Sequence, residues 1–110
     1  MSLLESRGTD PAPIFAALGD PTRLSLLTRL SDGQSRSIAS LSADTQLTRQ
    51  AVTKHLHVLE NAGLVKSSRT GRESRFAFQP EAVAEAKAYL DSVSRQWDDA
   101  LSRLRALVER

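Results

Sequence analysis

The feature that most limits how this chain can fold is a helix that outgrows the core available to it. Pro80 opens the helix, and apolar residues then recur at intervals of three and four from Val83 to Val108, a spacing that puts them on one helical face. The whole chain has 110 residues, which fits one domain with a single core. A helix over residues 80–109 is longer than that core can cover, so its apolar stripe needs a further partner.

This uncovered stripe predicts that two copies of the chain associate. Apolar stripes at this spacing typically pack against another helix, and the chain holds no second segment of comparable length. We therefore expect a homodimer with residues 80–109 as the dimerisation helix. The alternative is that the helix folds back over its own domain. The residues expected on the paired face are Leu90, Val93 (or Ser94), Trp97, Leu101 and Leu104.

Composition excludes several classes of protein. Hydrophobic residues make up 40% of the chain and charged residues 25%, and no apolar run approaches the roughly 20 residues of a membrane span. The first residues include an acid and lack the apolar stretch of an export signal. The absence of cysteine excludes disulfides, thiolate metal ligands and cysteine nucleophiles. We expect a soluble, cytoplasmic protein without membrane contacts.

Positive charge is concentrated in one quarter of the chain. The net charge is only +2, yet residues 48–75 hold six Lys or Arg against two Glu. A local field of this sign favours a polyanionic partner, most commonly nucleic acid. A solvated basic face without a partner is the alternative. The six cations are Arg49, Lys54, Lys66, Arg69, Arg72 and Arg75.

Start and stop signals predict two short helices in the first third of the chain. Asp10-Pro11 and Asp20-Pro21 each combine an N-cap residue with a proline at the first helical position. Gly19 and Asp32-Gly33 end the two helices. Residues 1–10 are expected to be a flexible N-terminus. The apolar positions are Ile14, Phe15 and Leu18 in the first helix and Leu24, Leu27 and Leu30 in the second.

A third short helix and a tight turn come next. Ser35 or Ser37 can cap a helix around residues 38–41, and the polar segment 44–46 interrupts it. Thr48 then caps a fourth helix. Two short helices joined by a polar turn, the second basic on its outer side, match the helix-turn-helix pattern.

The fourth helix contains both histidines, His55 and His57. Positions two apart on a helix point to nearly opposite sides, so the pair cannot bind one metal ion. The helix is indicated by Thr48, by the stop at Ala62-Gly63 and by the spacing of its apolar residues. His55 falls within the apolar face, where we expect a partly buried side chain with local hydrogen bonds. That face comprises Val52, Leu56 and Leu59, extended by Ala51, Val58 and Ala62.

The opposite face of this helix carries the donors that read DNA. An α-helix fits the major groove, where Arg pairs with guanine, Gln pairs with adenine, and Thr offers a hydroxyl or a methyl group. We predict Arg49, Gln50 and Thr53 as base readers, with Lys54 and His57 nearer the backbone. An exposed polar surface without a partner is the alternative for each residue alone. The predicted DNA-binding set from this segment is Thr48, Arg49, Gln50, Thr53, Lys54 and His57.

Two short runs with strand propensity, residues 64–69 and 74–78, flank a glycine-containing tip and predict a β-hairpin wing. Arg69, Arg72 and Arg75 belong to this hairpin and could contact phosphates or the minor groove. Their alternative role is to keep an exposed edge soluble. Arg72 is the strongest candidate because it lies at the tip.

These segments together resemble the ArsR family of winged helix-turn-helix repressors. The matching pieces are FAALGDPTRLSLLTRL (15–30), LTRQAVTKHLHVLENAGLV (47–65) and VKSSRTGRESRFAF (65–78). The resemblance implies a mainly α fold in the order α-α-α-α-β-β-α, and a homodimer built from the first and last helices. Phe15 and Leu18 would then join the dimer interface. It also implies two recognition helices about 34 Å apart on an operator.

The metal sites of many family members have no counterpart in this sequence. The family's cysteine pair would align with Ser40 and Ser42, which offer no thiolate. The alternative family site on the last helix needs histidines, and here that helix has only carboxylates, which are weak transition-metal ligands alone. We infer a metal-independent member without a cofactor, similar to those with a proline at the start of the last helix and a tryptophan within it, as Pro80 and Trp97 are here.

The sequence thus predicts a DNA-binding transcriptional regulator, a homodimeric repressor of its own or a neighbouring operon, with double-stranded operator DNA as its partner. No G-x-S-x-G elbow or glycine-rich phosphate loop supports an enzyme. One alternative is a winged helix that binds another protein. Another is a repressor released by a small organic molecule between the dimer helices, with Trp97 lining the pocket. The inducer itself is unknown.

Overall fold

The computed structural model describes residues 10–43 and 45–109. Within them, none of the helices is long and apolar enough to span a membrane. The predicted flexible N-terminus lies outside the described residues except for Asp10. The elements are α2 (Ala12–Leu18), α3 (Pro21–Leu30), β1 (Arg36–Ser37), α4 (Ile38–Ala43), α5 (Arg49–Asn61), β2 (Val65–Thr70), β3 (Glu73–Phe78) and α6 (Pro80–Val108).

The predicted mainly α, winged helix-turn-helix fold is confirmed, with one addition. The two-residue strand β1 pairs with β3, so the wing belongs to a three-stranded antiparallel sheet in the order β1-β3-β2. The hairpin β2-β3 pairs Val65 with Phe78 at its base and Thr70 with Glu73 at its tip. Gly71 closes the tip with φ +63°, a left-handed conformation that favours glycine.

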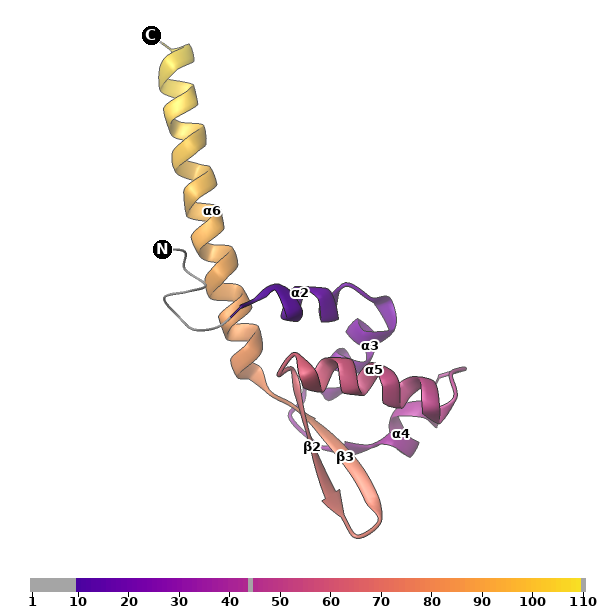
Figure 1. Cartoon of the computed structure of the whole chain (residues 1–110). Helices are drawn as coiled ribbons and strands as arrows, with labels where there is room; N and C mark the ends of the chain where they lie inside the picture. The colour runs from indigo at the N-terminus through magenta and orange to yellow at the C-terminus, as the bar shows by residue number, and fades with distance from the viewer. Residues whose placement is uncertain (1–9, 44, 110) are drawn as a thin grey trace.

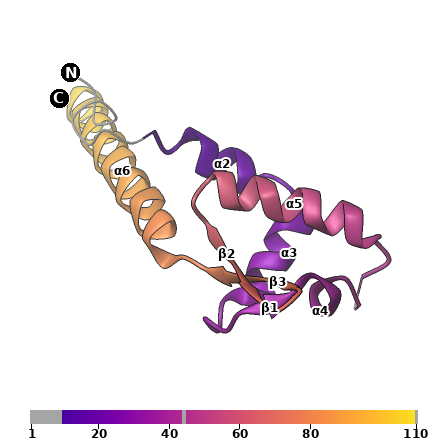
Figure 2. The ribbon, with the colours of Figure 1, turned by 60° about the horizontal axis from the view of Figure 1, so that its bottom comes forward.

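The core lies where helices α2, α3, α4 and α5 and the start of α6 meet the sheet (Figures 1 and 2). α3 contacts both α5 and β3, and α2 contacts α3, α5 and α6. Burying large aliphatic side chains is the main stabilisation available to such a small core. Its largest fully buried side chains are Leu26, Leu30, Leu41, Val52, Leu56, Leu59 and Leu64.

Helix α6 leaves this compact part as a long rod (Figure 1). Its first turn is tied down, because the Gln79 backbone N–H donates to Leu64 O over 2.9 Å. Gly63, with φ +78°, lets the chain turn beneath Ala82 of α6. A Cβ added at position 63 would lie 3.9 Å from the Cβ of Ala82. Farther along, the ring of Tyr89 meets Phe15 of α2 at 6.0 Å between centroids.

Most helix boundaries agree with the sequence signals. Asp20 caps α3 by accepting from the Arg23 N–H, and Thr48 caps α5 by accepting from the Ala51 N–H. Ser37, not Ser35, caps α4, since its hydroxyl accepts from the Ser40 N–H over 3.0 Å. α2 begins at Ala12 with Pro11 as its N-cap, one residue after the start that Asp10-Pro11 predicted.

Two residues of the predicted apolar faces are exposed. Leu24 is 48% exposed and Val58 is 41% exposed. Both lie at the margin of an apolar arc, and the neighbouring elements cover only the middle of each arc. Leu26, which the spacing did not single out, is buried instead, and it lies on the other side of Leu27 and Leu30 from Leu24.

Candidate nucleic-acid interface

The candidate site begins with the turn between α4 and α5. The Thr45 hydroxyl donates to Ser42 O over 3.0 Å and accepts from the Leu47 N–H over 3.2 Å. These bonds hold the turn, and the Thr48 cap fixes the first turn of α5 immediately after it. The sequence therefore builds a short helix, a turn and a capped second helix in fixed relation to one another.

The polar face of α5 points away from the core, as its spacing predicted. Arg49, Gln50, Lys54 and His57 are exposed. Thr53 is half-buried, and its hydroxyl donates to Arg49 O over 2.7 Å. That bond uses the hydroxyl proton and leaves the oxygen lone pairs and the methyl group for a partner. Opposite this face, Val52, Leu56 and Leu59 are fully buried.

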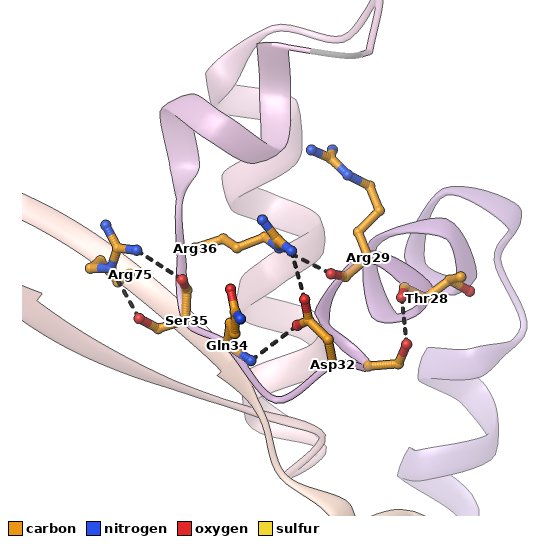
Figure 3. A network of polar contacts seen from close by, with 8 residues as sticks. Thr28, Arg29, Asp32, Gln34, Ser35, Arg36 and Arg75 are labelled. Atoms are coloured by element: carbon orange, nitrogen blue, oxygen red, sulfur yellow. Dashed lines mark hydrogen bonds and ion pairs between the residues drawn. The ribbon is translucent and has the colours of Figure 1, made fainter.

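The base of the wing is held by a polar network around β1 (Figure 3). Arg36 donates to Asp32 Oδ2 over 2.8 Å and to Arg29 O over 3.1 Å. The Gln34 backbone N–H also donates to Asp32. That backbone bond, followed by the charge of Arg36, lowers the pKa of the Asp32 carboxyl against the opposing effect of burial. The network thus fixes the chain between α3 and β1 at neutral pH.

Arg75 belongs to this network, although its spacing suggested a DNA contact. Its Nε donates to Ser35 Oγ over 3.0 Å and its Nη2 donates to Ser35 O over 2.8 Å. Its Nη1 pairs with Glu73 at 3.1 Å. Two of the three nitrogens therefore tie β3 to the segment before β1, and the third is paired within β3. Arg69 and Arg72, by contrast, are exposed on the hairpin.

A groove lies between the start of α5, the start of α4 and the wing tip. Its volume is about 330 Å³. Arg49 and Thr53 contribute from α5, and Arg72 and Ser74 contribute from the hairpin. Ser37 lines it from the end of β1. Glu73 also lines the groove, and its carboxylate is paired with Arg75. The two guanidinium-bearing residues and several hydroxyl groups from separate elements that remain around this open groove suit an anionic oxygen-rich ligand.

The acids of this basic segment are engaged within the fold. Glu60 accepts from the Ser67 hydroxyl and backbone N–H, which joins the end of α5 to β2. Glu73 is paired with Arg75. In the described part of the chain, Arg49, Lys54 and Arg72 have no ion-pair partner. The exposed field over the α5 face and the wing tip is therefore positive.

His55 is partly buried, as predicted, but its hydrogen bond is not local. Its Nδ1 lies 3.3 Å from Nη1 of Arg23, which is 32 residues away in α3. Sequence reasoning missed Arg23 because no local spacing connects it to α5. The only available signal was its place one turn into the helix that Asp20 caps.

The residues predicted for dimerisation fall into two groups. Phe15 and Leu18 are partly buried and pack against the core. The stripe on α6 is open: Leu90 is 53% exposed and Trp97 64% exposed. A shallow hollow of about 210 Å³ beside Trp97 is lined only by α6 residues, so one chain alone does not enclose a ligand there. Val93 is half-buried, while Leu101 and Leu104 are exposed.

The segment that the family resemblance aligns with a cysteine pair offers hydroxyl groups only. Ser40 is exposed, and Ser42 donates to Ala39 O over 3.2 Å. Across residues 10–43 and 45–109, no group of three His, Asp or Glu side chains is placed to hold a metal ion.

Comparison with known proteins identifies the family. The model of bacterial regulatory proteins of the arsR family matches residues 20–67. The chain is 43% identical over 74 residues to the uncharacterized HTH-type transcriptional regulator YuzN of Bacillus subtilis, an alignment covering 62% of this chain and 80% of YuzN.

Solved structures agree with this match. An ArsR-like transcriptional regulator from Rhodococcus sp. RHA1 is 35% identical, with a TM-score of 0.78 over 88% of this chain and 91% of that one. The homodimeric winged helix-turn-helix DNA-binding domain of Mb0332 from Mycobacterium bovis is 25% identical, with a TM-score of 0.65 over 87% and 89%. The chain belongs to the ArsR family and is a transcriptional regulator with a DNA-binding winged helix-turn-helix.

Proposed function

We propose that this regulator is a homodimeric repressor that reads an operator upstream of its own or a neighbouring operon. The observation that carries the proposal is the groove where Arg49 and Thr53 of α5 meet Arg72 of the wing. A duplex offers both ligands that such an arrangement needs, since base edges can face the helix while a phosphate enters beside the wing.

Each part of the interface has a separate task in this proposal. Arg49, Gln50 and Thr53 read bases from the first two turns of α5, and Lys54 and His57 contact the backbone. The Thr48 hydroxyl, which already accepts the cap bond, donates its proton to a phosphate. Arg69 and Arg72 contact phosphates or the adjacent minor groove. Arg75 holds the wing in place instead of contacting DNA, because its donors are bonded to Ser35 and Glu73.

The dimer is proposed to form through α6 together with α2. The half-exposed stripe on α6 supports it, since a run of large apolar side chains of this length is costly to leave in water. The homodimeric state of the Mb0332 domain supports it as well. The interface would comprise Phe15, Leu18, Leu90, Val93, Trp97, Leu101 and Leu104.

Release from DNA is proposed to be independent of metal. The chain has no cysteine, and carboxylates without nitrogen or sulfur donors bind transition metals weakly. Titration of the protein–operator complex with zinc or arsenite tests this part. We expect operator binding to persist at micromolar metal, and dissociation at that concentration would overturn it.

The central test is a fluorescence anisotropy titration against the DNA upstream of the chain's own gene. Arg49→Ala and Gln50→Ala should each weaken specific binding by about 10- to 100-fold and leave non-specific binding nearly unchanged. Arg103→Ala removes the same charge as Arg49→Ala from the exposed far part of α6 and serves as the matched control. Equal affinity of the wild-type protein for every duplex would refute sequence-specific repression.

A further inference from the structure

Arg23 makes contacts that join three helices. Its Nε donates to Ala17 O over 2.7 Å and its Nη2 donates to Ala16 O over 3.2 Å, so it satisfies two carbonyls at the end of α2. Its own backbone N–H donates to the Asp20 cap of α3. The remaining nitrogen, Nη1, lies 3.3 Å from Nδ1 of His55 in α5. One side chain in α3 therefore connects the end of α2 with the DNA-reading helix.

The contact with His55 requires a particular protonation state. A guanidinium has only donors, so Nδ1 must offer a lone pair, which leaves the proton of a neutral imidazole on Nε2. The charged groups that face His55 in the described structure are Arg23 and Asp20, whose Oδ2 lies 3.9 Å from Nδ1. The bond from the Arg23 N–H, followed by the charge of the Arg23 guanidinium, keeps the pKa of the Asp20 carboxyl below its ordinary value despite burial.

We propose that Arg23 is a positioning residue for DNA binding, which holds α5 against the end of α2 through neutral His55. The role rests on the DNA-binding function proposed above. α2 is also the helix that meets α6, where Phe15 and Tyr89 are in ring contact. The Arg23–His55 contact therefore lies between the proposed dimer helix and the helix that reads bases, and it sets the angle at which α5 is presented.

Protonation of His55 breaks this arrangement. A proton on Nδ1 removes the lone pair that Arg23 uses, places two donors face to face and turns the imidazolium toward Asp20. Histidine is the side chain that ordinarily changes charge between pH 5 and 8. We therefore expect operator affinity to fall when the pH is lowered and His55 is protonated. Added positive charge on a DNA-binding protein would by itself raise the affinity instead.

Three variants isolate the contact in operator titrations at pH 8 and pH 6. His55→Asn keeps an acceptor oxygen close to the Nδ1 position and cannot titrate, so it should bind like wild type at pH 8 and lose about fivefold less affinity at pH 6. His55→Leu lacks the acceptor and should bind about fivefold more weakly at pH 8. His57→Asn removes the other histidine, a proposed backbone contact on the exposed face, so it should weaken binding overall and still lose at least as much affinity as wild type between pH 8 and pH 6.

Two results in these titrations would overturn the proposal. One is a wild-type pH profile for His55→Asn, and the other is a flattened profile for His57→Asn, which would assign the effect to the exposed histidine. The ¹⁵N shifts of the His55 ring provide a readout without DNA and do not depend on the repressor function. The Nε2–H tautomer is expected at pH 8 in wild type, and a proton on Nδ1 at that pH would exclude the contact even if specific DNA binding were intact.

Discussion

Helices α5 and α6 carry the same kind of apolar stripe, but the two stripes differ in how far they are buried. Val52, Leu56 and Leu59 on α5 are fully buried, because α2, α3, α4 and β2 all contact that helix. On α6 only Ala82 and Ala86 are buried, and Leu101 and Leu104 remain 56% and 57% exposed. The stripe of α5 therefore contributes to monomer folding, whereas most of the stripe of α6 remains exposed.

This difference separates the tasks of the two helices. α5 buries its apolar side in the core and exposes its polar side to solvent, so its polar residues are the ones available for recognition. α6 presents its apolar side, so its leucines are the residues available for association. Substitutions on matching positions of the two stripes should consequently affect different measurements.

The largest effect is expected from placing charge on the open stripe of α6. Leu101→Glu with Leu104→Glu puts two carboxylates on each copy into the proposed interface, which should abolish the dimer. Operator affinity should fall by about 10³-fold, because the two half-sites no longer bind as one unit. Sedimentation velocity and anisotropy measure the two quantities.

The matched control for that variant is Ser102→Glu with Ala106→Glu. It adds the same charge to the same helix but on the opposite, exposed side. It should remain dimeric and bind the operator. A Leu101→Glu, Leu104→Glu protein that stays dimeric would show that α6 is not the interface.

The second prediction compares one leucine from each stripe. Leu56→Ala, at a fully buried position, should lower the free energy of unfolding by about 3 kcal/mol, through lost burial and the cavity it leaves. Leu101→Ala should leave the stability of the monomer nearly unchanged and weaken dimerisation instead. Urea unfolding at several protein concentrations separates the two, because only a dimer effect depends on concentration. Equal, concentration-independent losses would mean that α6 folds onto its own domain.

The stripes of both helices could be predicted from the sequence because local spacing determines them. Thr48 and Asp20 mark helix starts through contacts within three residues, and Pro80 marks one through its fixed backbone φ, so these starts could also be predicted. β1 could not, because two residues carry no period, and the strand exists only through pairing with Phe76 and Arg75.

Among the candidate site residues, prediction was limited by partners that are distant in sequence. The exposed side of α5 follows from helical geometry, and Arg49 and Gln50 are exposed as expected. The role of Arg75 depends on Ser35, 40 residues earlier, and the contact of His55 depends on Arg23, 32 residues earlier. Charge and spacing alone cannot distinguish an arginine that faces solvent from one whose donors are already bonded.

The third prediction uses two arginines of the wing to sharpen the contrast between exposed and engaged groups. Arg72→Ala should reduce operator affinity by about tenfold and lower the salt slope of log K by about 1.8, since each copy loses one phosphate contact. Arg75→Ala should leave that slope nearly unchanged and lower the melting temperature, because Ser35 loses its donors. Anisotropy titrations at four salt concentrations and thermal unfolding provide the data. If the salt slope decreased by this amount in Arg75→Ala and not in Arg72→Ala, the two assignments would be reversed.

The smallest effect concerns how the two helices begin. α5 has a side-chain cap in Thr48, whereas Gln79, the N-cap position of α6, makes no capping bond and relies on Pro80. Thr48→Ala should therefore cost about 1 kcal/mol of stability, while Gln79→Ala should cost little, because its N–H to Leu64 O is a backbone bond. Gln79→Asp supplies the missing acceptor at an extended backbone position and should stabilise the protein slightly. Urea midpoints for the three variants test this order, and a Gln79→Ala loss equal to that of Thr48→Ala would show that α6 depends on its first turn as much as α5 does.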